Sequence, residues 1–179
     1  MRRILVAGST GAGKTTLARA LAEALSIPFH EMDALAITGP DWEQNPELHK
    51  TMSQISATPA WVIDSLGYPS VRDLLWMHAD TVVWLDYSRP LVMRRVLRRS
   101  AARTLTRRRV FGGNVETLGG WLSADHPAWW SWSQFTARRA EILARSTDPR
   151  FAPLDIVRLR NPTAAQAWLA DTTRQAQKV

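Results

Sequence analysis

A glycine-rich stretch that ends in a lysine and a threonine is the first feature with recognisable chemistry. Residues 8–15 read G-S-T-G-A-G-K-T and fill every fixed position of the pattern G-x-x-x-x-G-K-[ST]. The glycines allow backbone conformations that turn N–H groups inward around phosphate oxygens, while the lysine reaches the β- and γ-phosphates and the last hydroxyl ligates Mg²⁺. The sequence therefore predicts ATP and Mg²⁺ as cofactors, bound through Gly8, Thr10, Gly11, Ala12, Gly13, Lys14, Thr15 and Thr16.

The flanking residues provide the context that this loop needs. Residues 2–7 form a short apolar run suited to a buried parallel strand, and Leu17, Leu21 and Leu25 recur on one helical face after the lysine. A helix N-terminus behind the loop adds partial positive charge for the phosphates. The segment therefore reads as strand, phosphate loop and helix.

Three aspartates each follow an apolar segment that reads as a strand. Asp64 comes directly after Trp61-Val62-Ile63 and is the best Mg²⁺-side carboxylate, acting through water, with a turn cap as the alternative. Asp33 is a candidate to bind or deprotonate an acceptor hydroxyl, or else to cap a helix or turn. Asp86 precedes Arg89-Pro90, where capping the following helix is the favoured role.

Strand-like and helix-like segments alternate along the whole chain. This alternation predicts an α/β fold of the P-loop NTPase type, a three-layer α/β/α sandwich with a five-stranded parallel sheet, in one domain covering 1–179. Glycine pairs and a proline mark residues 104–128 as a mobile lid insertion. The expected strands span about 2–7, 27–32, 61–63, 81–85 and 155–159, and helices are expected after the phosphate loop, at 46–57, 71–78 and 129–145, and from Pro90 and Pro162.

Charge is concentrated in one part of the chain. The formal net charge is +7, and the segment from Arg89 to Arg109 holds nine arginines and no acidic residue. Such a run is compatible with a nucleic-acid contact, a solvated helix face or an anion clamp. The absence of cysteine excludes disulfides and thiolate metal sites, and no apolar stretch reaches the length of a membrane span, so we expect a cytoplasmic protein.

The motifs together resemble the nucleoside and nucleotide kinase branch of the P-loop proteins. The more specific resemblance is to the adenylate kinase-related proteins often labelled DNA topology modulation proteins, which share the opening phosphate-loop pattern, a D-A-L, a W-V-I-D and a W-x-W. Here these stand at residues 3–15, 33–35, 61–64 and 130–132. One departure is the segment Asp64-Ser65-Leu66-Gly67-Tyr68, where that family commonly has D-G-N-Y.

The resemblance implies roles for particular arginines. Counted from Asp86, it implies that Arg95 packs on the ATP base and that Arg99 touches phosphate, and their spacing of four places both on one helix face. It also implies that Arg138 and Arg139 form a second group that closes on the transferring phosphates. Arg103 and residues 107–109 are further candidates if the lid folds inward, and a solvated surface position is the alternative for each.

The predicted function is an ATP-dependent kinase that transfers the γ-phosphoryl group to a nucleoside, nucleotide or similar metabolite. Its predicted catalytic residues are Lys14, Asp33, Asp64, Arg99, Arg138 and Arg139, with Thr15 and Asp64 at the metal. The alternative is an ATP-binding regulatory protein that binds nucleic acid through its arginine-rich helix. A GTPase switch is disfavoured because the chain has no N-K-x-D motif. Trp121, Trp129, Trp130 and Trp132 are expected to pack the lid and its returning helix, or to stack on an acceptor ring.

Overall fold

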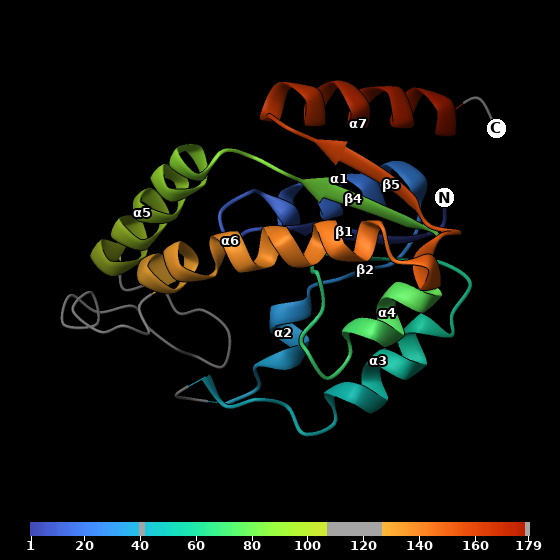
Figure 1. Ribbon diagram of the computed structural model, residues 1–179, viewed down its shortest axis with the longest axis horizontal. Coiled ribbons are helices and arrows are strands. Elements are labelled where there is room, and N and C mark those ends of the chain that lie inside the picture. Colours follow the sequence, from blue (N-terminus) through green and yellow to red (C-terminus); the bar gives the residue numbers. More distant parts are fainter. Residues whose placement is uncertain (40–41, 107–126, 178–179) are drawn as a thin grey trace.

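A five-stranded parallel sheet forms the centre of the computed structural model, which describes residues 1–39, 42–106 and 127–177 (Figure 1). The strand order is β2-β3-β1-β4-β5, and every paired neighbour runs parallel. The strands are β1 (Arg3–Gly8), β2 (Phe29–His30), β3 (Trp61–Ile63), β4 (Thr81–Leu85) and β5 (Asp155–Leu159). The predicted α/β class and the five-stranded parallel sheet are confirmed.

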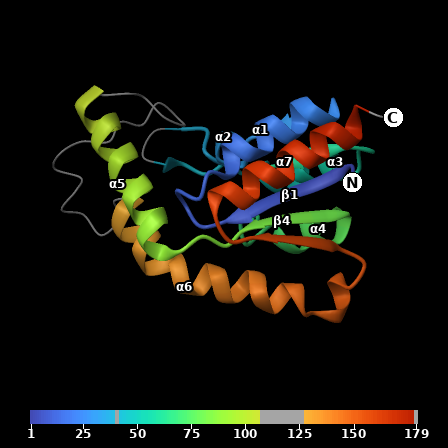
Figure 2. The same cartoon turned by 90° about the horizontal axis from the view of Figure 1, so that it is seen from above.

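Helices cover both faces of this sheet and give the predicted three layers (Figure 2). Helices α1 and α7 lie over one face, and α4 and α6 lie over the other. The helices are α1 (Lys14–Leu25), α2 (Met32–Ala36), α3 (Leu48–Ser56), α4 (Arg72–His78), α5 (Arg89–Thr106), α6 (Pro127–Ser146) and α7 (Pro162–Ala176), with a short 3-10 helix η4 (Pro149–Phe151).

Strand β1 is buried on both sides, as its apolar sequence predicts. Ile4 and Val6 pack against α1 and α7, while Leu5 and Ala7 pack into the opposite cluster with Trp61 and other residues of the α3–α4–α6 side. A strand with two covered faces needs apolar residues at every position rather than at alternate ones. This packing fixes the carboxyl end of β1, where the phosphate loop begins.

The second strand differs from the sequence expectation. It is only two residues long, and Asp33 lies in the first turn of α2 rather than at the end of a strand. Residues 27–32 contain Pro28, which limits the ladder, and the chain turns into a helix as soon as β2 ends. Asp33 still lies just beyond the carboxyl edge of the sheet, because α2 follows β2 directly.

The structure describes only the two ends of the predicted lid at residues 104–128. Residues 104–106 are the last turn of α5 and 127–128 are the first residues of α6, so these ends of the expected insertion are helical. Residues 107–126, which include Arg107, Arg108, Arg109 and Trp121, lie outside the described residues. No helix among the described residues combines the length and the apolar character needed to cross a bilayer.

Candidate active site

The phosphate loop connects β1 to α1 with three glycines in backbone conformations that L-residues rarely adopt. The φ angles are 146° at Gly8, 87° at Gly11 and 97° at Gly13. A β-carbon at Gly11 would lie 2.5 Å from Val96 Cγ2, because α5 packs directly against the loop. Backbone conformation therefore favours glycine at all three positions, and at Gly8 and Gly11 a β-carbon would also clash with its neighbours.

Lys14, Thr15 and Thr16 occupy the first turn of α1, with Gly13 as the N-cap. The first N–H groups of a helix have no partner within the helix, and no side chain caps this end. These donors and the helix dipole together suit an anion at the loop. The predicted nucleotide-binding residues thus stand in the strand–loop–helix arrangement that phosphate binding requires.

Asp64 lies beside Thr15, at the carboxyl end of β3. Its Oδ2 accepts a hydrogen bond from Thr15 Oγ1 at 2.5 Å, and its Oδ1 accepts one from the Met32 N–H at 2.9 Å. The carboxylate is buried, and burial raises its pKa although these two hydrogen bonds act in the opposite direction. The two predicted Mg²⁺-side groups are therefore direct neighbours.

Charged groups from four parts of the chain meet around Lys14. Burial is the largest cause that lowers the pKa of Lys14 to about 8. The positive charges of Arg138 and Arg99 lower it further, whereas Asp33 and Asp64 act in the opposite direction. Five of the six predicted catalytic residues are thus close enough to influence one another's charge.

Asp33 has a partner that the sequence analysis did not identify. Tyr68 Oη donates a hydrogen bond to Asp33 Oδ1 at 3.1 Å, and Asp33 itself is exposed. Burial and the negative charge of Asp33 raise the pKa of Tyr68, so its hydroxyl stays protonated and acts as the donor. The loop at residues 64–68 departs from the family pattern, but its tyrosine still contacts Asp33.

Arg138 extends from α6 into the same region. Burial and the charge of Arg72 lower the pKa of Arg138, while Asp33, Tyr68 and Glu141 oppose that shift. Arg72 is itself paired with Glu141 and donates through Nε to Gly67 O at 2.9 Å. Arg138 therefore lies on the Asp33 side of Lys14, where an acceptor would be expected.

The arginines of α5 lie on the other side of the loop. Arg95 Nη1 donates to Ala12 O at 3.1 Å, and its guanidinium lies 5.6 Å from the centre of the Tyr87 ring. Arg99, one turn further along α5, is near enough to Lys14 to affect its pKa. The placement of both residues beside the loop agrees with their implied contacts to base and phosphate, which stay predictions.

Arg139 does not join Arg138. It donates through Nε to Asp86 Oδ1 at 2.7 Å, and Arg158 from β5 donates to the same carboxylate. Consecutive residues on a helix point about 100° apart, and here the two neighbouring arginines face different groups. Asp86 does not cap α5, because α5 begins only at Arg89 and the Asp86 oxygens bind arginines, so the expected capping role was wrong. The phosphate contact implied for Arg139 stays a prediction.

The tryptophans beside the predicted lid show one clear contact. Trp132 stacks under Arg89, whose guanidinium lies 3.6 Å from the ring centre and donates to Trp132 O at 2.7 Å. Trp132 and Trp129 are both about half exposed. The Arg89–Trp132 contact ties the start of α5 to α6, in line with a packing role; Trp121 and the Trp130 side chain lie outside the described residues.

Comparison with known protein families finds a match for the part of the chain that contains the phosphate loop. A model of the ATPase family associated with various cellular activities (AAA) matches residues 4–76, which run from β1 into α4 and contain Lys14, Asp33 and Asp64. No curated protein sequence matches the chain.

Solved structures match almost the whole chain. A shikimate kinase from Acinetobacter baumannii in complex with shikimate has a TM-score of 0.55 at 17% identity, covering 99% of this chain and 94% of that one. A gluconokinase from Sinorhizobium meliloti 1021 has a TM-score of 0.52 at 20% identity, with the same coverage of 99% and 94%. The fold is that of P-loop kinases.

These matches settle the fold and leave the narrower family assignment open. The P-loop kinase architecture agrees with the predicted branch of the P-loop proteins. The assignment to the adenylate kinase-related, DNA topology modulation-like group stays a prediction, as does the implied nucleotide acceptor. At these levels of identity, activity must be argued from the residues of this chain.

Proposed function

We propose that this protein is an ATP-dependent kinase that transfers the γ-phosphoryl group to a hydroxyl group of a small metabolite. The observation that carries the proposal is the arrangement around Lys14: the Thr15–Asp64 pair and the exposed carboxylate of Asp33 both lie close enough to act on the charge of this lysine. Asp64 suits the metal side of a phosphoryl-transfer site, and Asp33 suits the general base that takes the proton of an acceptor hydroxyl.

The nucleotide half of the site rests on the loop and on α5. The backbone N–H groups of the loop would hold the phosphates, and Lys14 would bridge the β- and γ-phosphate oxygens. Arg95 would pack on the base and Arg99 would contact phosphate, since both approach the loop from one face of α5. Each of these groups is positive or a donor, as a triphosphate requires.

The residues beside the loop fit a Mg²⁺ ion. Thr15 and Asp64 supply hard oxygen ligands, and Mg²⁺ at such sites is bound by one or two protein groups together with phosphates and water. Among the described residues no group of three or more His, Cys, Asp or Glu could hold a metal alone, which agrees with a phosphate-dependent site. When bound, the ion would neutralise charge on the phosphate oxygens.

The acceptor half rests on Asp33, Tyr68 and Arg138. The Tyr68 hydroxyl occupies Asp33 Oδ1, so Oδ2 remains to accept the proton of an acceptor hydroxyl. The acceptor oxygen forms a bond to the γ-phosphorus as the bond to the bridging oxygen breaks, and ADP leaves. Lys14, Arg99 and Arg138 surround this reaction with positive charge and would stabilise the transferring group.

The acceptor is proposed to be a hydroxylated metabolite with an anionic group. Arg138 supplies a partly buried cation beside Asp33, so the site can bind one hydroxyl and one negative charge of the same molecule. The similar structures belong to kinases of shikimate and gluconate, both of which are hydroxylated carboxylates. Nucleotides, the acceptors expected from the sequence, also carry hydroxyls and negative charge and belong in the same test.

An assay of ADP formation with a panel of acceptors tests the proposal. Shikimate, gluconate, nucleosides and nucleoside monophosphates are each added to the protein with ATP and Mg²⁺. At least one should raise ADP formation well above the rate with water alone, and Asp33→Asn should remove that increase while leaving ATP binding intact. If ADP forms at the same rate with every compound tested as with water alone, the result counts against the kinase assignment.

A further inference from the structure

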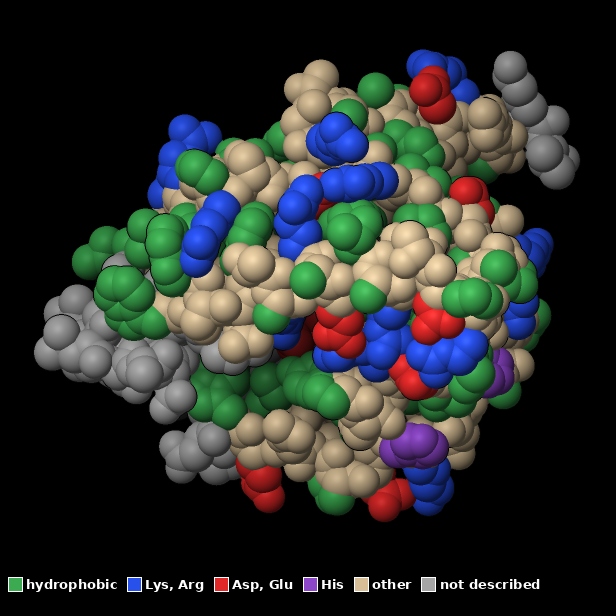
Figure 3. Space-filling model, in the orientation of Figure 1, with side chains coloured by type: hydrophobic (Ala, Val, Ile, Leu, Met, Phe, Trp, Pro, Cys, Tyr) green, Lys and Arg blue, Asp and Glu red, His purple; other side chains and the backbone are tan. Residues whose placement is uncertain are grey.

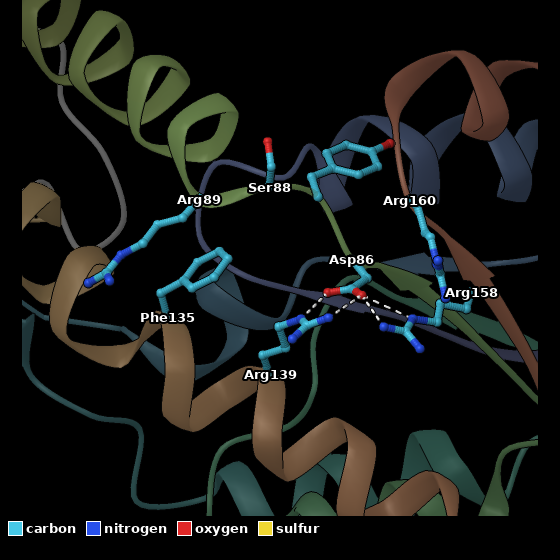
Figure 4. A pocket seen from close by; sticks show the side chains of 8 residues that line it. Asp86, Ser88, Arg89, Phe135, Arg139, Arg158 and Arg160 are labelled. Atoms are coloured by element: carbon cyan, nitrogen blue, oxygen red, sulfur yellow. Dashed lines mark hydrogen bonds and ion pairs between the residues drawn. The ribbon is translucent and has the colours of Figure 1, made fainter.

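A hollow lies beyond the carboxyl ends of β4 and β5, next to α6. Its volume is about 390 Å³, and Asp86, Arg139, Arg158, Arg160 and Phe135 line it. Figure 4 shows Arg158 and Arg160 on the β5 side of this hollow and Arg139 on the α6 side, with Asp86 between them. We call this group of residues the Asp86 hollow.

Asp86 is already saturated by two of these arginines. Arg139 donates Nε and Nη2 to its two oxygens at 2.7 and 3.2 Å, and Arg158 donates Nε and Nη2 to Oδ2 at 3.0 and 2.5 Å. Burial opposes the charge of Asp86, but the hydrogen bonds from Arg139 and Arg158 lower its pKa. The carboxylate therefore stays negative at neutral pH and contributes one unit of charge.

The arginines outnumber the acid in the Asp86 hollow. Four arginines line the hollow against the single negative charge of Asp86: Arg89, which is held against Trp132, and Arg139, Arg158 and Arg160. Within the described part of the chain, Arg160 makes no hydrogen bond or ion pair, and the Nη1 groups of Arg139 and Arg158 donate to no residue. The hollow thus holds three excess positive charges and several N–H donors.

A nearby ion-pair network on the same face of the molecule shows the contrast. Between α6, α4 and η4, three arginines pair with three acids, so the charges balance: Arg72, Arg145 and Arg150 contact Asp73, Glu141 and Asp148. Figure 3 shows red and blue side chains mixed there, whereas blue side chains dominate above it. Surplus guanidinium groups in a hollow are suited to an oxyanion, which they can bind with paired donors.

We propose that the Asp86 hollow binds a small oxyanion, a phosphate or carboxylate group, at a site separate from the phosphate loop. The oxyanion would contact Arg160 and the remaining Nη1 donors of Arg139 and Arg158, while the Asp86 pairs hold those two side chains in position. The volume of about 390 Å³ leaves room for a metabolite attached to that group, and the Phe135 ring offers an apolar wall for its carbon skeleton.

The test uses protein saturated with a non-hydrolysable ATP analogue and Mg²⁺, so that the phosphate loop is filled. Inorganic phosphate and, separately, succinate are titrated at constant ionic strength and followed by calorimetry. Saturable binding of one equivalent is expected for at least one of them, and the two arms distinguish phosphate from carboxylate. Arg160→Gln should weaken that binding about tenfold, the size of one hydrogen bond to a charged group.

Arg160→Gln is a suitable variant because Arg160 is exposed and its loss should not disturb folding. Arg150→Gln is the matched control, since Arg150 is also exposed but pairs with Asp148 and Asp73 on another part of the surface. It should bind the oxyanion like the wild type. The proposal is overturned if neither anion shows saturable binding, or if binding is the same in Arg160→Gln, as it would be for an anion captured at Arg138.

Discussion

Thr15 Oγ1 lies 2.5 Å from Asp64 Oδ2, and this contact joins the phosphate loop to the end of β3. Because the pair stands where Mg²⁺ is expected, Asp64→Asn should lower every ATP-consuming reaction, including slow hydrolysis to water. The amide keeps the shape but removes the charge, so a loss on the order of a hundredfold in turnover is expected. Turnover measured against Mg²⁺ concentration provides the check.

Asp33→Asn provides the comparison for that variant. Asp33 is exposed on the acceptor side, so replacing its carboxylate by the amide of asparagine should impair only transfer to the acceptor. ATP affinity and acceptor-independent hydrolysis should stay unchanged. Calorimetric ATP affinities and transfer rates for the two variants separate the roles. Equal loss of ATP affinity in both would remove the acceptor role from Asp33.

Lys14→Met should abolish transfer and make the unliganded protein more stable. Burial and neighbouring arginines lower the pKa of Lys14 to about 8, so its positive charge opposes folding at neutral pH. Removing that charge should raise the free energy of unfolding by roughly 1 to 3 kcal/mol. Denaturant unfolding at pH 7 measures the change. Lys50→Met, at an exposed lysine of α3, is the control and should leave both stability and transfer nearly unchanged.

The same pKa sets an alkaline limit on ATP use. The free protein holds Lys14 protonated below about pH 8 and loses that proton above it, so kcat/KM for ATP should fall about tenfold per pH unit above that value. Folding stability should move the other way and rise between about pH 8 and 10.5, where the unfolded chain binds more protons than the native one. A kcat/KM that stays constant to pH 9.5 would show that the lysine charge is not needed.

Arg138 and Arg139 should behave differently although they are neighbours. Arg138→Gln removes a partly buried cation beside Asp33 and Lys14 and should lower transfer about a hundredfold. Arg139→Gln leaves Asp86 with Arg158 alone and should cost about 1 kcal/mol of stability, since Arg139 is half exposed, with transfer changed by only a few fold. Steady-state rates and thermal unfolding of both variants make the comparison. Comparable losses of transfer in the two variants would show that Arg139 also acts on the transferring phosphates.

The parts of the fold that follow from local pattern were predictable from the sequence. The strands at 61–63 and 81–85 match the structure because both are buried along their whole length and are therefore mostly apolar. The strand at 155–159 also matches, although it is an edge strand that carries Asp155 and Arg158. The phosphate loop was equally predictable, because each of its glycines is needed for a backbone conformation or for a close contact. Helix α2 was not predicted, since a five-residue helix leaves too short a pattern to recognise.

The long-range contacts of the site were not predictable. Nothing near Asp86 indicates that its partners are Arg139 and Arg158, which are 53 and 72 residues away in sequence. The hydrogen bond from Tyr68 to Asp33 likewise depends on how the loop after β3 meets α2. Helical geometry offered one indication: consecutive positions on α6 point about 100° apart, which favours different partners for Arg138 and Arg139.

The most direct test of the kinase assignment is to follow the γ-phosphoryl group itself. Protein, Mg²⁺ and ATP labelled with ³²P in the γ position are incubated with a deproteinised extract of small metabolites, and the labelled products are separated. The wild type should move label from ATP into an organic phosphate ester, and Lys14→Ala and Asp33→Asn should not. Label that stays in ATP, or appears only as inorganic phosphate at the same rate with and without the extract, would contradict the account.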